Sequence, residues 1–402
     1  MRDSFIEMIV RRGRRASRRL RDAAHSQTHR RCRSRSVDLR ARWIATDPYP
    51  HYEELRAEGT VLHLRKQGCW IVLGYEEVRS AAGNSEAFSN EGYRRVDSVL
   101  LGADPPQHTQ MRRIVSGYFA PEALDRTMDG FEEYAESLLA PRFDLVSQYA
   151  VPLTEHAAVK LIGFDDEVAA ALAGAEPQDR SLAGAPEASW RGERGDADRR
   201  RKRSRWIVER SLERCELYPR LLGEGIDESQ ARSLVWLFWI AATTTTERAI
   251  ARCIETLLSR IDLRKRLATD EGLIPRFVEE VLRLHCPELM VPRVTTVPIS
   301  LGGRSIPEKE LVYLCLAAAN RDPAIFENPA EVDLERKGPQ PLSFGFGAHH
   351  CPGAALSRRE TIGAVRTIVR SAPGIRVASR PHWWSIMTVN ALDRMIVETG
   401  PE

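Results

Sequence analysis

The hydrophobic pattern of this chain is mainly helical. Apolar residues recur at three- and four-residue spacing in long segments, and shorter segments resemble helices or strands. The expected long helices cover 107–140, 147–173, 203–222, 227–260 and 272–285, with shorter ones at 51–58 and 75–82. The expected strands lie in a pair within 60–73 and near 292–301, 311–314 and 386–397. We therefore predict a mainly α protein with a small β region.

The segment from about Asp227 to Arg260 is predicted to be a helix buried on every side. Its centre, L-V-W-L-F-W-I-A-A, is apolar all round, and Asp227 is a suitable N-cap. Four threonines follow at 243–246, where β-branched side chains favour helix poorly and can bond to carbonyls one turn earlier. This departure from the local rule indicates a functional position, although a polar seam between buried helices would also explain it.

Charge is distributed unevenly along the 402 residues. The formal net charge is +3, but residues 1–36 contain twelve arginines and three acidic residues, so the other 366 residues carry −6. We predict a basic, disordered extension over 1–40 and a single domain over 41–402, with a mobile charged loop at 174–205. A mis-assigned start, or contact of the extension with a membrane, nucleic acid or acidic protein, are the alternatives. We do not expect a nucleic-acid-binding protein overall.

No segment reaches the length of a transmembrane helix, and the apolar stretch Phe5–Val10 is too short to span a bilayer. The seven cysteines are scattered singly, without any C-x-x-C pair. An odd number of unpaired cysteines is typical of a reducing compartment. We therefore predict a cytoplasmic protein.

One of these cysteines, Cys351, lies in a distinctive segment, F-G-F-G-A-H-H-C-P-G-A-A-L-S-R at 344–358. A thiolate in a glycine-rich turn at the start of a helix is stabilised by backbone N–H groups, and the missing Cβ atoms let a flat cofactor approach. One thiolate cannot complete a zinc site, but it can hold haem iron from one face. A buried cysteine in a glycine-rich turn is the alternative.

Two further segments add weight to this interpretation. E-E-V-L-R at 279–283 places Glu280 and Arg283 on one helical face, as many surface ion pairs also do. D-P-P-Q-H-T-Q-M-R-R at 104–113 places His108 and Arg112 one turn apart.

In order and approximate spacing, these segments resemble bacterial cytochromes P450, and the resemblance covers roughly residues 45–400. It implies the cytochrome P450 fold and a haem b with Cys351 as the axial ligand. It also implies that propionates bind four donors: His108, Arg112, Arg293 and His349. The cofactor-binding loop would include Phe344, Gly345, Gly347 and Gly353. Glu280 and Arg283 would form a buried structural network with Arg336. Ser357 departs from the alanine usual in this family.

The threonine segment also departs from the family pattern A-G-x-(D/E)-T. Aligned on this chain, the family threonine is Thr245, and Thr244 replaces the acid that relays protons. Threonine does not ionise near neutral pH. Other groups could still supply protons for oxygen insertion, or a substrate group could join the relay. Alternatively, the reaction could be oxidative coupling, cyclisation, desaturation or peroxide-driven oxidation.

The resemblance implies a soluble haem-thiolate monooxygenase that oxidises a small organic molecule in specialised metabolism. Electrons would come from a separate ferredoxin and ferredoxin reductase, with Arg358 and Arg359 as candidate docking residues. The alternatives are a substrate tethered to a carrier protein and a non-catalytic helper protein. Trp236 and Trp239 are expected in the core, whereas one of Trp383 and Trp384 would either line the substrate pocket or pack in the core.

Overall fold

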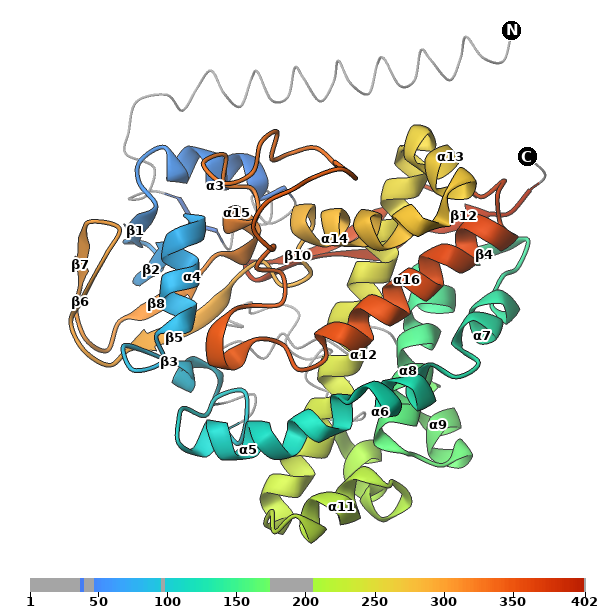
Figure 1. Cartoon of the computed structure of the whole chain (residues 1–402), viewed down its shortest axis with the longest axis horizontal. Coiled ribbons are helices and arrows are strands. Elements are labelled where there is room, and N and C mark those ends of the chain that lie inside the picture. The colour runs from blue at the N-terminus through green and yellow to red at the C-terminus, as the bar shows by residue number, and fades with distance from the viewer. Residues whose placement is uncertain (1–36, 40–46, 95–97, 174–204, 401–402) are drawn as a thin grey trace, which may run out of the picture.

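The computed structural model describes residues 37–39, 47–94, 98–173 and 205–400, and the predictions for the extension over 1–36 and the loop over 174–204 lie outside this part of the chain. Helix dominates, as predicted (Figure 1). The α-helices are α3 (Tyr49–Arg56), α4 (Tyr75–Gly83), α5 (Gln107–Ser116), α6 (Pro121–Met128), α7 (Phe131–Ser137), α8 (Val151–Ile162), α9 (Asp166–Ala173), α11 (Leu217–Gly223), α12 (Glu228–Ser259), α13 (Ile261–Thr269), α14 (Ile274–Leu284), α15 (Leu316–Ala319) and α16 (Ala354–Ser371).

In the described part of the chain, the strands are short and form four small sheets. They are β1 (Val61–Leu64), β2 (Cys69–Val72), β3 (Phe88–Ser89), β4 (Arg142–Asp144), β5 (Val291–Thr295), β6 (Ile299–Leu301), β7 (Arg304–Ile306), β8 (Leu311–Leu314), β9 (Arg376–Val377), β10 (His382–Ile386), β11 (Val389–Arg394) and β12 (Ile396–Glu398). The largest sheet has the order β1-β2-β8-β5-β3, and its β2–β8 pair is parallel. The other sheets are β10-β11, β4-β12-β9 and β6-β7.

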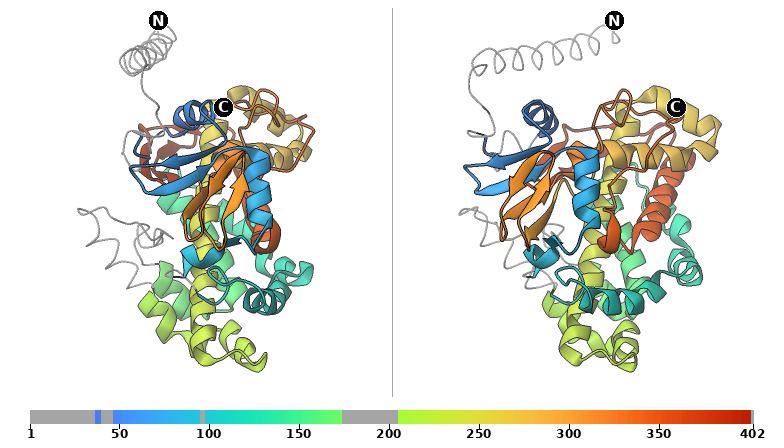
Figure 2. Two further views of the ribbon diagram at one scale, coloured as in Figure 1. Left: turned by 90° about the vertical axis from the view of Figure 1, so that its left-hand side faces the viewer. Right: turned by 60° about the vertical axis from the view of Figure 1, so that its left-hand side comes forward.

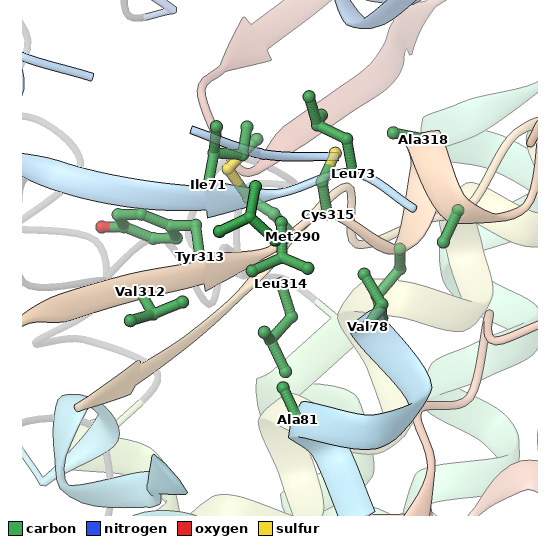
Figure 3. Close-up of a cluster of buried hydrophobic side chains, with 14 of the residues drawn as sticks. Ile71, Leu73, Val78, Ala81, Met290, Val312, Tyr313, Leu314, Cys315 and Ala318 are labelled. Atoms are coloured by element: carbon green, nitrogen blue, oxygen red, sulfur yellow. The ribbon is translucent and has the colours of Figure 1, made fainter. Parts of the chain in front are cut away.

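The five-stranded sheet has its own hydrophobic core, which packs against α4 (Figure 3). Ile71, Val312 and Leu314 are fully buried on the strands, and Val78 is fully buried on α4. Leu39 joins the same core although it precedes residue 41, so the packed domain includes residues before the predicted boundary.

The helical part surrounds α12, which runs through the middle of the molecule (Figures 1 and 2). Asp227 accepts the Gln230 N–H at 3.0 Å and caps this helix. Trp236 and Trp239 are buried on it, as predicted. Helices α8 and α16 pack along α12, and α16 crosses in front of it in Figure 1. This crossing brings the start of α16, and with it Cys351, beside the threonines.

The predicted helical segment at 107–140 is divided into α5, α6 and α7. Pro121 occupies the first turn of α6, where its missing N–H costs nothing, and Gly130 precedes α7 with a left-handed φ of 68°. The apolar periodicity continues across both breaks. In the described part of the chain, no helix is long and apolar enough to cross a membrane.

Candidate functional site

A cavity lies between the sheet and the helices, and residues that are distant in sequence line it. They come from α5, from the centre of α12, from the α14–β5 connection and from the loop that precedes α16. Of the residues predicted for the site, those that line this cavity are His108, Arg112, Thr245, Arg293, Phe344, Gly345, His349, Cys351 and Gly353.

The loop before α16 is tightly turned. Gly345 and Gly347 both adopt a left-handed φ of 73°, which favours glycine. A Cβ on Gly347 would also lie 2.7 Å from the Ala82 carbonyl oxygen at the end of α4, so this loop can approach α4 only without a side chain there. The Cys351 N–H donates to the Phe344 carbonyl at 2.8 Å and closes the turn.

The Cys351 thiol faces the cavity at the start of α16. Burial raises its pKa, whereas the Gly353 N–H and the charges of Arg112 and Arg358 favour the thiolate. Arg358 lies over the Phe344 ring, with Cζ 4.2 Å from the ring centroid. The sulfur is therefore held among positive groups on one wall of the cavity.

Four nitrogen-bearing side chains from three separate segments meet beside this loop. The rings of His108 and His349 lie 3.9 Å apart between centroids. Both ring nitrogens of His108 and Nε2 of His349 are buried without a hydrogen-bond partner. Burial is the main cause that lowers the His349 pKa to about 3, and His108, Arg293 and Arg112 lower it further. Arg112 and the buried Arg293 complete a set of donors that face the same cavity.

Glu280 and Arg283 form a separate, closed network away from the cavity. Arg283 donates from Nε and Nη2 to the two Glu280 oxygens at 2.8 and 3.0 Å. Arg336 donates from Nε to the same carboxylate at 2.9 and 3.0 Å. The remaining nitrogen of Arg283 donates to the carbonyls of Asn320 and Pro329. Both arginines that the resemblance groups with Glu280 thus bind its buried carboxylate.

The threonines of α12 differ in direction. Thr243 and Thr244 are fully buried, and their hydroxyls donate to carbonyls one turn earlier at 2.9 and 2.8 Å. Thr245 lines the cavity, whereas Thr244 does not. The structure therefore brings only one of the two predicted catalytic threonines to the cavity, because a rotation of one residue turns the Thr244 side chain into the helix packing.

The Thr246 hydroxyl forms a hydrogen bond with α16 and not with a carbonyl of its own helix. It donates to the Ser357 hydroxyl at 3.1 Å, so the serine that departs from the family pattern links two helices at the cavity wall. Sequence reasoning identified Ser357 as unusual but did not identify its partner, which lies 111 residues upstream.

Two carboxyl groups in the cavity wall were not predicted from the sequence. Glu360 on α16 is 1% exposed, and burial raises its pKa well above its usual value, which favours the protonated form. Glu288 lies in the α14–β5 connection, with its carboxylate 3.6 Å from the Arg248 guanidinium on α12. No local spacing signals Glu288, since its ionic partner is 40 residues away on another element.

Other predicted residues lie outside the cavity. Trp383 packs against a core cluster, and the Arg252 guanidinium lies 4.0 Å from its ring centroid; neither Trp383 nor Trp384 lines the cavity. Arg358 pairs with Glu279, and Arg359 pairs with Asp125, both at 2.5 Å. These ion pairs reduce the free positive charge available for docking.

The cavity residues fit haem, which the resemblance implies. One sulfur could bind the iron, and the unpartnered nitrogens of His108 and His349, with Arg112 and Arg293, could bind two carboxylates. Buried polar atoms without partners are rare in folded proteins, and a ligand explains them directly. The glycines at the sulfur leave room for a flat ring.

Comparison with known proteins agrees with this chemistry. The family model described as Cytochrome P450 matches residues 219–371. The beta-dihydromenaquinone-9 omega-hydroxylase of Mycobacterium tuberculosis is 31% identical over 379 residues, which cover 89% of this chain and 77% of that protein. The cytochrome P450 monooxygenase PikC of Streptomyces venezuelae is 29% identical, covering 84% of this chain and 87% of PikC.

A solved structure shares the whole architecture. The crystal structure of P450BioI in complex with an acyl carrier protein that bears hexadec-9Z-enoic acid superposes with a TM-score of 0.80 at 26% identity. The match covers 89% of this chain and 100% of that chain. By its sequence relatives and by its fold, this chain belongs to the cytochrome P450 family, so it is an oxidoreductase that uses haem with a thiolate-bound iron.

Proposed function

We propose that this protein is a monooxygenase that oxidises a small, largely apolar organic molecule, with Cys351 as the axial ligand of haem b. The observation that carries this proposal is the position of the Cys351 thiol in the wall of an apolar cavity that Thr245 of α12 also lines. Haem bound by a thiolate supplies the reductive splitting of dioxygen that oxygen insertion needs.

The residues of this chain have separate tasks in the proposal. His108, Arg112, Arg293 and His349 bind the haem propionates, because buried carboxylates require charge-assisted donors. Phe344, Gly345, Gly347 and Gly353 shape the loop around the sulfur. Thr245 presents a hydroxyl to the reacting side of the cavity, and apolar side chains such as Leu237 and Phe238 exclude water from it.

Electrons are supplied by a separate ferredoxin and its reductase, in the cytoplasm. We infer these electron donors from the family resemblance. The ion pairs of Arg358 and Arg359 favour a docking surface that does not depend on these two residues alone.

The carbon monoxide spectrum of the reduced, purified protein tests the axial ligand. A Soret band at the red-shifted position that is typical of thiolate ligation supports Cys351, and the Cys351→Ser variant should lose this band. Cys215→Ser is a matched control, because its buried sulfur does not line the cavity and makes hydrogen bonds with Leu212 and Tyr218 that serine can also make. A thiolate band that persists in Cys351→Ser would refute the assignment.

A second candidate reaction is coupling, cyclisation, desaturation or peroxide-driven oxidation. Thr244, which occupies the family's acid position, favours it, because its hydroxyl cannot serve as an acid and is bonded to Ile240. If proton supply limits an ordinary oxygen insertion, Thr244→Asp should raise the yield of product per NAD(P)H consumed. An unchanged or lower yield would count against proton limitation and favour the second candidate.

A carrier-bound substrate is a variant of the main proposal. The similarity to P450BioI, which was solved with an acyl carrier protein, supports it. The arginine-rich segment at 191–205, which could contact a carrier, lies almost wholly outside the described residues. Turnover of a carrier-bound acyl chain, but not of the free acid, would establish this variant.

A further inference from the structure

The ionisable side chains of the cavity are not all needed for haem. Cys351 and the four nitrogen donors have proposed tasks, which leaves Tyr93 and two carboxyl groups, Glu288 and Glu360. Glu360 is almost completely buried, and no charged side chain among the described residues pairs with it. Glu288 has a guanidinium beside it and keeps 25% of its side chain exposed, so it is the carboxyl group that can ionise and still contact a bound molecule.

The position of Glu288 is fixed by its neighbours. The Cys286 thiol donates to the Glu288 carbonyl at 2.9 Å, and the Leu289 N–H donates to the Thr388 carbonyl in the β10–β11 turn at 2.7 Å. These two contacts hold the backbone at Glu288, which limits the places that its side chain can reach. This rigidity is what a specific binding contact requires.

The carboxylate of Glu288 is only partly satisfied. Its Oε2 atom lies 3.6 Å from Nη1 of Arg248, and both atoms are buried without a hydrogen bond. That separation allows Coulomb attraction but is too long for a hydrogen bond. Arg248 itself does not line the cavity, so a ligand meets the carboxylate and not the guanidinium.

The remainder of the cavity away from the cysteine is apolar. Its wall is formed mainly by aliphatic and aromatic side chains, which include Leu100, Leu101, Phe119, Leu237, Phe238 and Val291. An apolar wall with one partly exposed carboxyl group, that of Glu288, indicates a ligand that is apolar along most of its length and carries one positive group.

We propose that Glu288 is a substrate-binding residue, which anchors a positively charged nitrogen on an otherwise apolar substrate. This inference rests on the proposed monooxygenase function and specifies its substrate class. Arg248 positions the carboxylate from behind, and a ligand cation supplies the second partner that this carboxylate lacks. An ion pair of this kind orients the apolar part of the substrate in the cavity.

The proposal implies a pH dependence of binding. Burial raises the pKa of Glu288 to about 7, although Arg248 lowers it. Glu288 attracts a ligand cation only when it is ionised, and near neutral pH its ionised fraction increases with pH. Glu288 also interacts electrostatically with Tyr93 and Cys286, whose pKa values burial raises, and Arg293 acts in turn on Tyr93. Affinity for a permanent cation should therefore rise as pH increases through about 7.

Calorimetric titration of the holoenzyme with three ten-carbon probes tests this assignment. Decyltrimethylammonium is the cation, decan-1-ol is the neutral probe and decanoate is the anion, all below their micelle concentrations. The quaternary nitrogen neither titrates nor binds iron, so its pH dependence reports on the protein. At pH 8 the cation should bind about 10-fold more tightly than the alcohol, as expected for one partly screened ion pair.

The Glu288→Gln variant should lose this preference for the cation and should also lose its pH dependence. Glu335→Gln is the matched control, because Glu335 is a surface carboxylate that pairs with Arg266 and Arg276 away from the cavity. It should retain the wild-type preference. If Glu288→Gln folds poorly, the pH dependence of the wild type still decides the question without any variant.

Four outcomes would overturn the proposal: equal binding of the cation and the alcohol, a preference that survives in Glu288→Gln, tighter binding of decanoate, or no binding of the cation at pH 8. The carbon monoxide spectrum of the same preparation separates this failure from failure of the proposed function. A protein with the thiolate band but no charge preference refutes only the anchor, whereas a missing band refutes the monooxygenase proposal.

Discussion

Two clusters of buried charged and polar side chains in this protein are satisfied in opposite ways. Every guanidinium nitrogen of Arg283 has an acceptor, from Glu280 or from backbone carbonyls. In contrast, both ring nitrogens of His108 and one of His349 have none. A buried polar group without a partner costs free energy, so a fold retains it only where something else supplies the partner. The closed cluster therefore belongs to the fold, and the open cluster belongs to a ligand.

The closed cluster should show the largest effect. Replacing Arg283 by Met leaves Arg336 as the arginine that pairs with Glu280 and removes the Arg283 hydrogen bonds to three backbone carbonyls. We expect the free energy of unfolding in urea to fall by about 3–5 kcal/mol, as for other broken buried ion pairs. Arg276→Met, on the same helix, removes an exposed pair with Glu335 and a hydrogen bond to the Leu334 carbonyl, and should cost below about 1 kcal/mol. Equal losses in the two variants would mean that the buried network does not support the fold.

Glu288 is intermediate between the two clusters, with one ion pair and no side-chain hydrogen bond, and its effect should depend on pH. Its pKa is about 7 in the folded protein and about 4.5 when unfolded. The folded state therefore loses stability as pH rises from about 4.5 to 7, because the charged form is disfavoured there.

Glu288→Gln does not titrate, so relative to the wild type it should become more stable by up to about 3 kcal/mol between pH 4.5 and pH 8. Urea unfolding at a series of pH values measures this difference. Glu335→Gln should follow the wild-type curve. A constant difference between wild type and Glu288→Gln at all pH values would show that the carboxyl group is not desolvated.

The open cluster should respond in haem binding and not in folding. His108→Leu removes one proposed hydrogen-bond donor to the haem propionates. The affinity for haem, measured from the rate of haem transfer to apomyoglobin, should therefore be lower by about 10- to 100-fold. The haem-free protein should not be destabilised to the same extent, because the substitution also removes two buried nitrogens without partners.

His156→Leu is the matched control for this experiment. His156 also carries a buried nitrogen without a hydrogen bond and stacks on Tyr134, with 4.4 Å between ring centroids, but it does not line the cavity. Haem retention in this variant should be unchanged. If both histidine variants lost haem equally, the effect would come from general loosening and not from a lost propionate contact.

The contrast between the clusters also explains what the sequence could predict. Glu280, Arg283 and the Cys351 loop are encoded by short spacings on one element, and the long helices follow from apolar periodicity. The sequence does not show that β2 and β8 pair, because about 240 residues separate them. Glu288 was missed for the same reason, since Arg248 approaches it only in the folded chain. The single-residue rotation that turns Thr244 away from the cavity depends on how α12 packs against its neighbours.

The Thr246–Ser357 hydrogen bond should show the smallest effect. Ser357→Ala restores the residue that is usual in the family and removes one contact of 3.1 Å between α12 and α16. The Thr246 hydroxyl can then bond to a carbonyl of its own helix, as the three preceding threonines do, so the loss in unfolding free energy should be about 0.5–1 kcal/mol. Ser137→Ala, which removes only an exposed bond to the Tyr134 carbonyl, should change stability by less than about 0.5 kcal/mol. If Ser357→Ala lost as much unfolding free energy as Arg283→Met, this contact would support the fold, as the closed cluster does. If haem retention fell while stability was unchanged, the contact would serve the ligand, as the open cluster does.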